Sequence, residues 1–153
     1  MRKIITAYHG TTSTSLLILG KKSSSGTFGA GYYYGDLACA INYADGGLIK
    51  KALIELSNPI EYDAQYDEST DGYALHLVKK LFGSNSAHFI QMMRQTDYFY
   101  LGDEFSQAVK GLGHDGIVVK YDCGAFEIIA FDKCCIETVS IESSQMYRGL
   151  NHD

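Results

Sequence analysis

The chain has little of several features that would place it in particular classes of protein. It contains no Trp and one Pro among 153 residues, and none of its apolar runs approaches the roughly 20 residues that a membrane-crossing helix needs. We therefore expect no membrane span. The first residues are basic and then briefly apolar, but polar residues interrupt them before the apolar segment of a secretory signal is complete. The expected location is the cytoplasm, either of the producing cell or, for a delivered effector, of a target cell.

Positive charge is also scarce. Lys and Arg number 13 against 18 for Asp and Glu, which gives a net charge of −5 with His neutral. Proteins that coat nucleic acid neutralise many phosphates with Lys and Arg, so the composition argues against that class, although not against an enzyme that acts on a nucleic acid. With 46% hydrophobic and 20% charged residues, a chain of this length is expected to fold as one soluble, monomeric domain.

The four cysteines lack the spacings that metal sites use. None of them forms a Cys-x-x-Cys pair, and no His stands at a zinc-like distance from them. We therefore expect free thiols and no metal. Cys123, between Asp122 and Gly124, is the weakest functional alternative as a nucleophile, because no neighbouring His is present to activate it.

The pattern of apolar residues predicts an α+β domain, with strands towards both ends and helices among them. Short apolar or alternating segments predict strands over residues 3–8, 51–56, 116–121, 126–131 and 135–142. Apolar residues at helical spacing, with capping residues or glycines at the ends, predict helices near residues 37–44, 74–82, 86–93 and 103–112. Asp36 is the expected N-cap of the first helix, and Gly46-Gly47 its expected stop.

We expect a single domain over residues 1–146, with a helical insert at about 72–112 and a loosely held tail at 147–153. A turn is expected directly after the first strand, at residues 9–12, and a polar connection over residues 61–71.

Three features of the sequence call for a reason. His9 ends the first predicted strand, the triplet at 32–34 places three tyrosines in a glycine-rich loop, and Glu127 interrupts an apolar strand. Each alone has an ordinary structural explanation, such as exposure or aromatic cover over bare backbone. Glu127 is the most informative, because it shares a strand face with Ile129 and Phe131, and a carboxylate is costly to bury without a partner. The glycines of the loop are expected to let a ligand approach closely.

Taken together, these segments resemble the three ordered motifs of ADP-ribosyltransferases. The first is Tyr8-His9-Gly10-Thr11, the second is Gly31-Tyr32-Tyr33-Tyr34, and the third runs from Phe126 to Phe131. The likeness is to the His-Tyr-Glu branch that diphtheria toxin and the poly(ADP-ribose) polymerases share. Ala40-Ile41-Asn42-Tyr43 is similar to the helix end that follows the second motif, and residues 113–119 resemble the stretch before the catalytic strand of small bacterial and phage members.

The resemblance implies an ADP-ribosyltransferase-like fold, with mixed or antiparallel sheets surrounded by helices, NAD+ as substrate and no metal. It implies that Glu127 is catalytic, bonds a ribose hydroxyl and helps to activate the incoming nucleophile, with His9 and Tyr33 as the other catalytic residues. The motif favours Tyr33, whereas the spacing to the helix tyrosine favours Tyr32. The residues implied to bind NAD+ are His9, Gly10, Thr11, Tyr33 and Tyr43.

The activity so implied is mono-ADP-ribosylation of a protein or nucleic acid by a bacterial or phage toxin, effector or defence protein. Ala125 stands where members that modify arginine have Glu, which argues against arginine as the acceptor. One alternative is a catalytically silent module of the same fold that binds NAD+, ADP-ribose or a partner protein. Another is an enzyme like the RNA 2′-phosphotransferases, which is disfavoured because paired basic residues for a phosphorylated RNA are missing.

Overall fold

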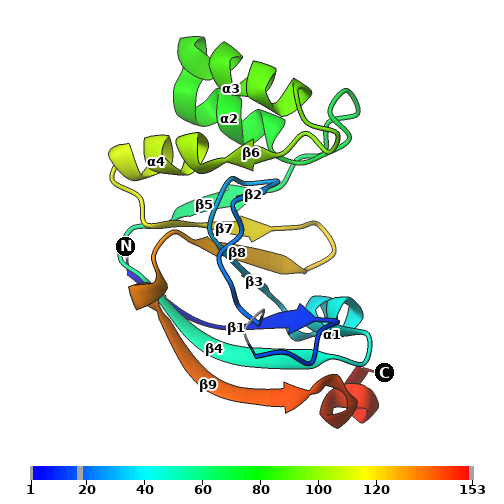
Figure 1. Cartoon of the computed structure of the whole chain (residues 1–153). Coiled ribbons are helices and arrows are strands. Elements are labelled where there is room, and N and C mark those ends of the chain that lie inside the picture. Colours follow the sequence, from blue (N-terminus) through cyan, green and yellow to red (C-terminus); the bar gives the residue numbers. More distant parts are fainter. Residues whose placement is uncertain (1, 17–18, 152–153) are drawn as a thin grey trace.

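A seven-stranded mixed sheet organises the chain, whose computed structural model describes residues 2–16 and 19–151 (Figure 1). The strand order is β5-β7-β8-β3-β1-β4-β9, and β2 and β6 form a separate two-stranded sheet. The predicted single α+β domain is thereby confirmed. Within the described residues, no helix is both long and apolar enough to cross a membrane. The strands are β1 Lys3–Thr11, β2 Ser25–Gly26, β3 Tyr32–Gly35, β4 Leu48–Leu56, β5 Ile60–Asp63, β6 Leu101–Gly102, β7 Gly116–Lys120, β8 Phe126–Ala130 and β9 Ile136–Ser143.

The large sheet is divided between β1 and β3. β1 pairs along its whole length with β4, whereas it meets β3 at the single pair Tyr8↔Gly35. On the other side, β3 pairs residue by residue with β8. Figure 1 shows β1, β4 and β9 curving away from the half that holds β7 and β8. Beyond Tyr8 the two halves therefore separate, and space opens between them.

Helix α1, Leu37–Ala44, follows β3 and begins where the sequence predicts. The Asp36 carboxylate accepts a hydrogen bond from the Cys39 N–H at 2.9 Å through one oxygen and from the Phe126 N–H at 3.1 Å through the other. The N-cap therefore also ties the helix to β8. The helix ends before the predicted glycines, because Asp45 adopts the left-handed conformation at φ 38°.

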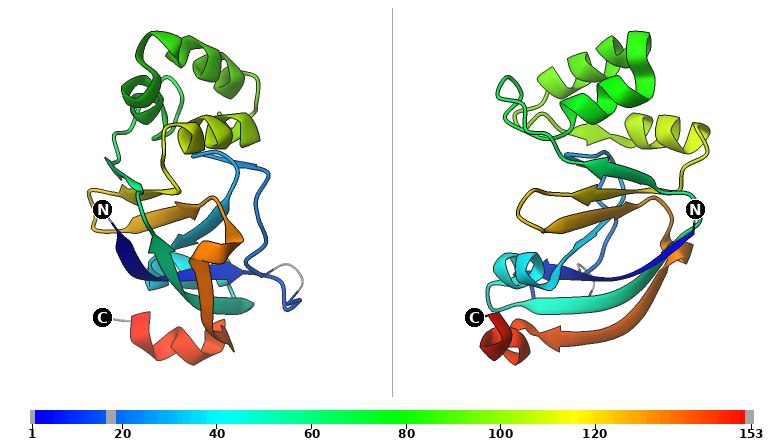
Figure 2. Two further views of the ribbon diagram at one scale, coloured as in Figure 1. Left: turned by 90° about the vertical axis from the view of Figure 1, so that its left-hand side faces the viewer. Right: turned by 180° about the vertical axis from the view of Figure 1, so that it is seen from behind.

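The region at 72–112 carries most of the helical structure and covers one face of the β5-β7-β8 half (Figures 1 and 2). The expected third helix does begin at Ser86, but it continues from the second through a 3-10 turn rather than after a loop. The short strand β6 lies in the same region and pairs with β2. The helices are α2 Leu75–Phe82, η1 Gly83–Asn85, α3 Ser86–Arg94 and α4 Asp103–Gly111.

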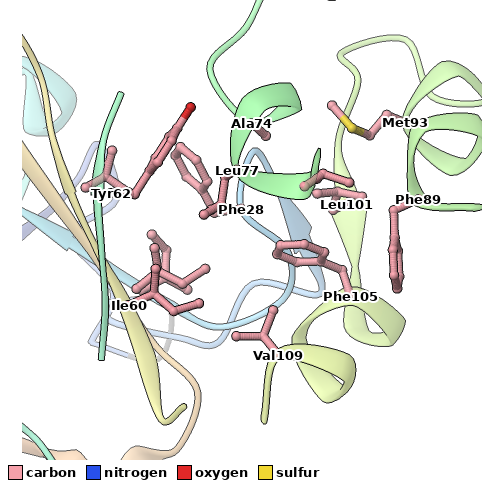
Figure 3. Packing of buried hydrophobic residues seen from close by; sticks show 14 of the residues in the cluster. Phe28, Ile60, Tyr62, Ala74, Leu77, Phe89, Met93, Leu101, Phe105 and Val109 are labelled. Atoms are coloured by element: carbon pink, nitrogen blue, oxygen red, sulfur yellow. The ribbon is translucent and has the colours of Figure 1, made fainter. Parts of the chain in front are cut away.

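A buried apolar cluster joins these helices to the sheet (Figure 3). Phe28 and Phe105 are fully buried in it. The rings of Phe28 and Tyr62 pack edge to face, with their centroids 6.2 Å apart. Ile129 of β8 contributes from the sheet. Because Glu127 is two residues earlier on the same strand, it lies on this face of the sheet, as the period-two pattern predicts.

Three expectations about the strands are wrong. The tyrosine triplet at 32–34 does not lie in a loop but forms most of β3, which pairs with β8. The first strand does not stop at Tyr8 but continues through Thr11, because residues 9–11 pair with β4. The polar connection also contains a strand, β5, which pairs in parallel with β7. In all three places a distant partner supplies the backbone hydrogen bonds that local sequence does not reveal.

The described part of the expected tail, residues 147–151, has regular structure. Ser144–Asn151 form a 3-10 helix, η3, after β9. The Tyr147 ring packs edge-on against Tyr8 with centroids 6.4 Å apart. Residues 152–153 of that expected tail lie outside the described residues.

The glycine-rich loop packs on the protein itself. A Cβ at Gly26 would lie 2.5 Å from the Tyr33 hydroxyl, and one at Gly29, where φ is +90°, would lie 2.5 Å from the Ser106 Oγ. A Cβ at Gly31 would lie 2.7 Å from Ile129. At these three positions the protein's own atoms fill the space that a side chain would occupy, whereas Gly35, the last glycine of the loop, lines the cleft described below.

Candidate functional site

A cleft of about 860 Å³ lies where the two halves of the sheet separate. Its size falls in the range of roughly 300–1,000 Å³ that is typical of small-molecule sites. Residues of β1, β3, α1, the segment after β5 and the β7–β8 hairpin line it. They are Tyr8, His9, Gly10, Tyr33, Tyr34, Gly35, Cys39, Ala40, Tyr43, Ala64, Gln65, Tyr66, Tyr73, Tyr121, Asp122, Cys123, Ala125, Phe126 and Glu127.

The structure brings most of the residues singled out from the sequence to this one cleft. His9, Tyr33 and Glu127 all line it, as do Gly10 and Tyr43. Thr11 is not among the lining residues, and its hydroxyl instead accepts a hydrogen bond from the Ser13 N–H at 3.2 Å. Four of the five segments of the resemblance therefore contribute residues to a common space, and residues 113–119 do not.

Glu127 lies on β8, opposite Gly35 of β3 and Val119 of β7. Burial raises the pKa of its carboxyl group from the usual 4.5 to about 7, because the charged form loses hydration. The Tyr121 hydroxyl donates to its Oε1 at 3.3 Å, and this bond opposes the rise. The carboxyl group is thus held in a poorly hydrated position on the cleft wall, and its protonation changes near neutral pH.

His9 is fixed by the strand on the far side of the division. Its Nδ1 lies 2.9 Å from the Tyr33 carbonyl oxygen, which accepts, so Nδ1 carries a proton. Burial lowers the pKa of His9, the bond to Tyr33 opposes this, and the nearby charge of Lys50 lowers it further. The neutral ring keeps Nε2 as a hydrogen-bond acceptor.

Tyr33 and Tyr43, the two tyrosines implied to bind NAD+, differ in their surroundings. The Tyr33 hydroxyl donates to the Gly29 carbonyl at 2.6 Å and accepts from the Phe28 N–H at 3.0 Å, and burial raises its pKa. Its ring is therefore fixed. Tyr43 on α1 is 72% exposed, which leaves its ring free to contact a ligand. Tyr32 is not among the lining residues. It packs against a second buried apolar cluster, which includes Ala7, Ile54 and Ile128, so the geometry favours Tyr33 as the residue of the motif.

Three tyrosines that the sequence does not single out, Tyr66, Tyr73 and Tyr121, form an aromatic wall of the cleft. The centroid of the Tyr73 ring lies 5.3 Å from that of Tyr66 and 5.1 Å from that of Tyr121, and both pairs have edge-to-face geometry. The tyrosines belong to no motif, and their separation in the chain hides their contact. The place of Tyr121 follows from the register of the hairpin, in which Val119 pairs with Glu127 and alternation sets the residue two positions on beside the carboxylate.

Comparisons of the chain with protein-family models, with curated proteins and with solved structures find no match.

Proposed function

We propose that this chain is a mono-ADP-ribosyltransferase, which cleaves the bond between nicotinamide and ribose in NAD+ and transfers ADP-ribose to a macromolecule. The observation that carries the proposal is the meeting of His9, Tyr33 and Glu127 in one cleft of suitable size. Their order matches the three motifs that the sequence resembles, and a shared cleft is what joint action on one dinucleotide requires.

The chemistry needs negative charge beside the ribose. As the bond from C1′ to the nicotinamide nitrogen breaks, its electron pair leaves with nicotinamide, and positive charge spreads over the ribose ring. The Glu127 carboxylate, poorly hydrated on the cleft wall, stabilises that charge. The acceptor then attacks C1′ and gives its proton to the carboxylate, which leaves ADP-ribosylated acceptor, nicotinamide and a protonated Glu127 that returns its proton to water.

The other lining residues suit the parts of NAD+ that do not react. Tyr33 and Tyr43 offer ring faces to nicotinamide, and aromatic contacts of this kind contribute about 0.5–1.5 kcal/mol beyond buried area. Gly10 lines the cleft, and by the same resemblance its backbone groups bond the carboxamide. Its lack of a side chain is explained by packing on α1, because a Cβ there would lie 2.1 Å from the Ala40 carbonyl oxygen. Nε2 of the neutral His9 is an acceptor that suits a ribose hydroxyl.

The acceptor is a protein or a nucleic acid. Ala125, two residues before Glu127, lines the cleft, and the members of the resembling family that modify arginine have Glu at that place. This disfavours arginine. By the same resemblance, we place the protein among bacterial or phage toxins, effectors or defence proteins.

The test uses the full chain, NAD+ labelled in its adenine, and a bacterial lysate as the source of acceptor. We expect nicotinamide release and transfer of label, both lost in Glu127→Gln and both retained in the control Glu137→Gln, which changes an exposed carboxylate on β9. NAD+ binding by calorimetry without nicotinamide release would instead support a silent binding module. Absence of both binding and release would overturn the proposal.

A further inference from the structure

One side chain outside the resembling motifs touches the carboxylate on which the proposed chemistry depends. The Tyr121 hydroxyl donates to Glu127 Oε1 at 3.3 Å. We propose that Tyr121 is a positioning residue, which orients the Glu127 carboxylate and favours its ionised form. The inference rests on the proposed function only where it concerns turnover, because the contact itself belongs to the free protein.

Tyr121 is held firmly enough for this role. Its N–H donates to the Ala125 carbonyl at 2.9 Å, and its carbonyl accepts from the Gly124 N–H at 3.0 Å, so both backbone groups are fixed within the hairpin turn. Its ring meets Tyr73 at 5.1 Å with planes 85° apart. The Tyr73 backbone is in turn held, since its carbonyl accepts from the Tyr62 hydroxyl at 2.7 Å. The hydroxyl is therefore presented from a fixed ring.

Within residues 2–16 and 19–151, no cation pairs with Glu127. Among the residues that the structure describes, Tyr121 alone donates a hydrogen bond to this carboxylate, and no Lys or Arg forms an ion pair with it. The titratable groups that line the cleft with it come from β1, β3, α1, the segment after β5 and the β7–β8 hairpin, with Asp36 directly before α1. They are Tyr8, His9, Tyr33, Tyr34, Asp36, Cys39, Tyr43, Tyr66, Tyr73, Tyr121, Asp122 and Cys123.

These neighbours leave the Tyr121 hydroxyl as the main stabiliser of the anion. Burial raises the pKa of Tyr33 and of Tyr121, and it raises the pKa of the Cys39 thiol to about 11, so all three stay neutral at pH 7. His9 is neutral because burial lowers its pKa. Removing the hydroxyl therefore removes the one contact that lowers the pKa of Glu127, and the carboxyl group should ionise at higher pH.

The first arm of the test measures this without NAD+. The full chain, labelled with 13C at the Glu side-chain carboxyl carbons, is titrated by NMR, and Glu127→Gln identifies the Glu127 signal. A hydrogen bond to a charged group corresponds to a shift of about one pH unit or more, so Tyr121→Phe should raise the midpoint by about one unit. The control Tyr73→Phe keeps the ring that packs on Tyr121 and should leave the midpoint unchanged. An unmoved midpoint in Tyr121→Phe would overturn the inference.

A second variant tests the same contact even if Tyr121→Phe fails to fold. Site-specific 3-fluorotyrosine at position 121 keeps the ring and makes the hydroxyl more acidic, hence a stronger donor. It should move the Glu127 midpoint to lower pH, opposite to Tyr121→Phe. A midpoint that stays in place with both variants, or moves upward with the fluorinated ring, contradicts the role we assign to the hydroxyl.

The second arm separates this inference from the proposed function. The pH dependence of kcat/KM for nicotinamide release reports ionisation in the free enzyme. If the midpoint rises by one unit, Tyr121→Phe should be about fivefold slower at pH 7 and nearly equal to wild type at pH 9. A uniform loss across pH would overturn the proposal that Tyr121 favours the ionised form of Glu127 during turnover. If Tyr121→Phe shifts the NMR midpoint but the wild-type protein releases no nicotinamide, the proposed function is refuted. The effect of Tyr121 on the ionisation of Glu127 would still hold.

Discussion

The raised pKa of Glu127 has a consequence for stability that can be measured without any substrate. A carboxyl group that titrates at about 7 in the native state and at 4.5 in the unfolded chain binds more protons when folded between those values. Stability must then fall as pH rises through this range. This loss of stability is absent well below pH 4.5, where both states are protonated. It is complete well above pH 7, where both states are ionised.

The size of the effect follows from the shift. The difference of 7 − 4.5 = 2.5 pH units corresponds to roughly 3 kcal/mol at 1.36 kcal/mol per unit. Between pH 5 and pH 8.5 the change is about 2.5 kcal/mol, because part of the titration lies below pH 5. Glu127→Gln replaces the carboxyl with an uncharged group of similar shape. The variant should therefore gain about 2.5 kcal/mol relative to wild type over this interval.

Urea unfolding at the two pH values measures this gain. With a typical slope of 1–3 kcal/mol per molar urea, the midpoint of Glu127→Gln relative to wild type should move up by about 1 M between pH 5 and pH 8.5. The control Glu137→Gln, on an exposed part of β9, should follow wild type. If Glu127→Gln and wild type change in parallel, the carboxyl group is well hydrated, and the argument from burial is wrong.

Two further predictions concern how the cleft is built. Gly10→Ala should destabilise the protein by about 1–3 kcal/mol, because its Cβ would lie 2.1 Å from the Ala40 carbonyl oxygen. Urea unfolding measures this loss. The control Gly111→Ala, with open space around its Cβ, should be neutral or slightly stabilising. Asp36→Ala should cost about 1–2 kcal/mol at pH 7. Although partial burial opposes it, hydrogen bonds from Cys39 and Phe126 hold the pKa of Asp36 below its usual value, so this cost should disappear as pH falls through that lowered pKa. A cost that persists at acid pH would contradict the assigned role of the carboxylate.

Features that depend on neighbouring residues could be predicted from the sequence. Asp36 caps α1 because a short acidic side chain reaches the N–H three residues on, and the helical spacing that follows marks the core face. The face of Glu127 followed from alternation along one strand. These predictions needed no knowledge of which segments meet.

Features that depend on distant partners could not be predicted. Residues 9–11 look like a turn because they include a glycine and small polar residues, yet β4 supplies a full set of partners. The strand β5 follows Pro59 within a polar segment, and only its pairing with β7 defines it. Likewise, the contact of Tyr121 with Glu127 depends on the register of a hairpin, and the contact of Tyr121 with Tyr73 joins separate segments.

The unpredicted extension of β1 is what makes the cleft suitable for a planar amide. Past Tyr8, β1 has β4 on one side, while on the other side the described residues provide no paired strand. Such an edge presents N–H and C=O groups that are not used within the sheet, and an amide ligand can satisfy both kinds of group at once, as an added strand does. Gly10 lies on this edge and lines the cleft, and no side chain fits there beside α1. The same division of the sheet that exposes this edge leaves Glu127 on the opposite wall. Under the proposed function, this one break in strand pairing accounts for both the recognition of the carboxamide and the placement of the carboxylate beside the ribose.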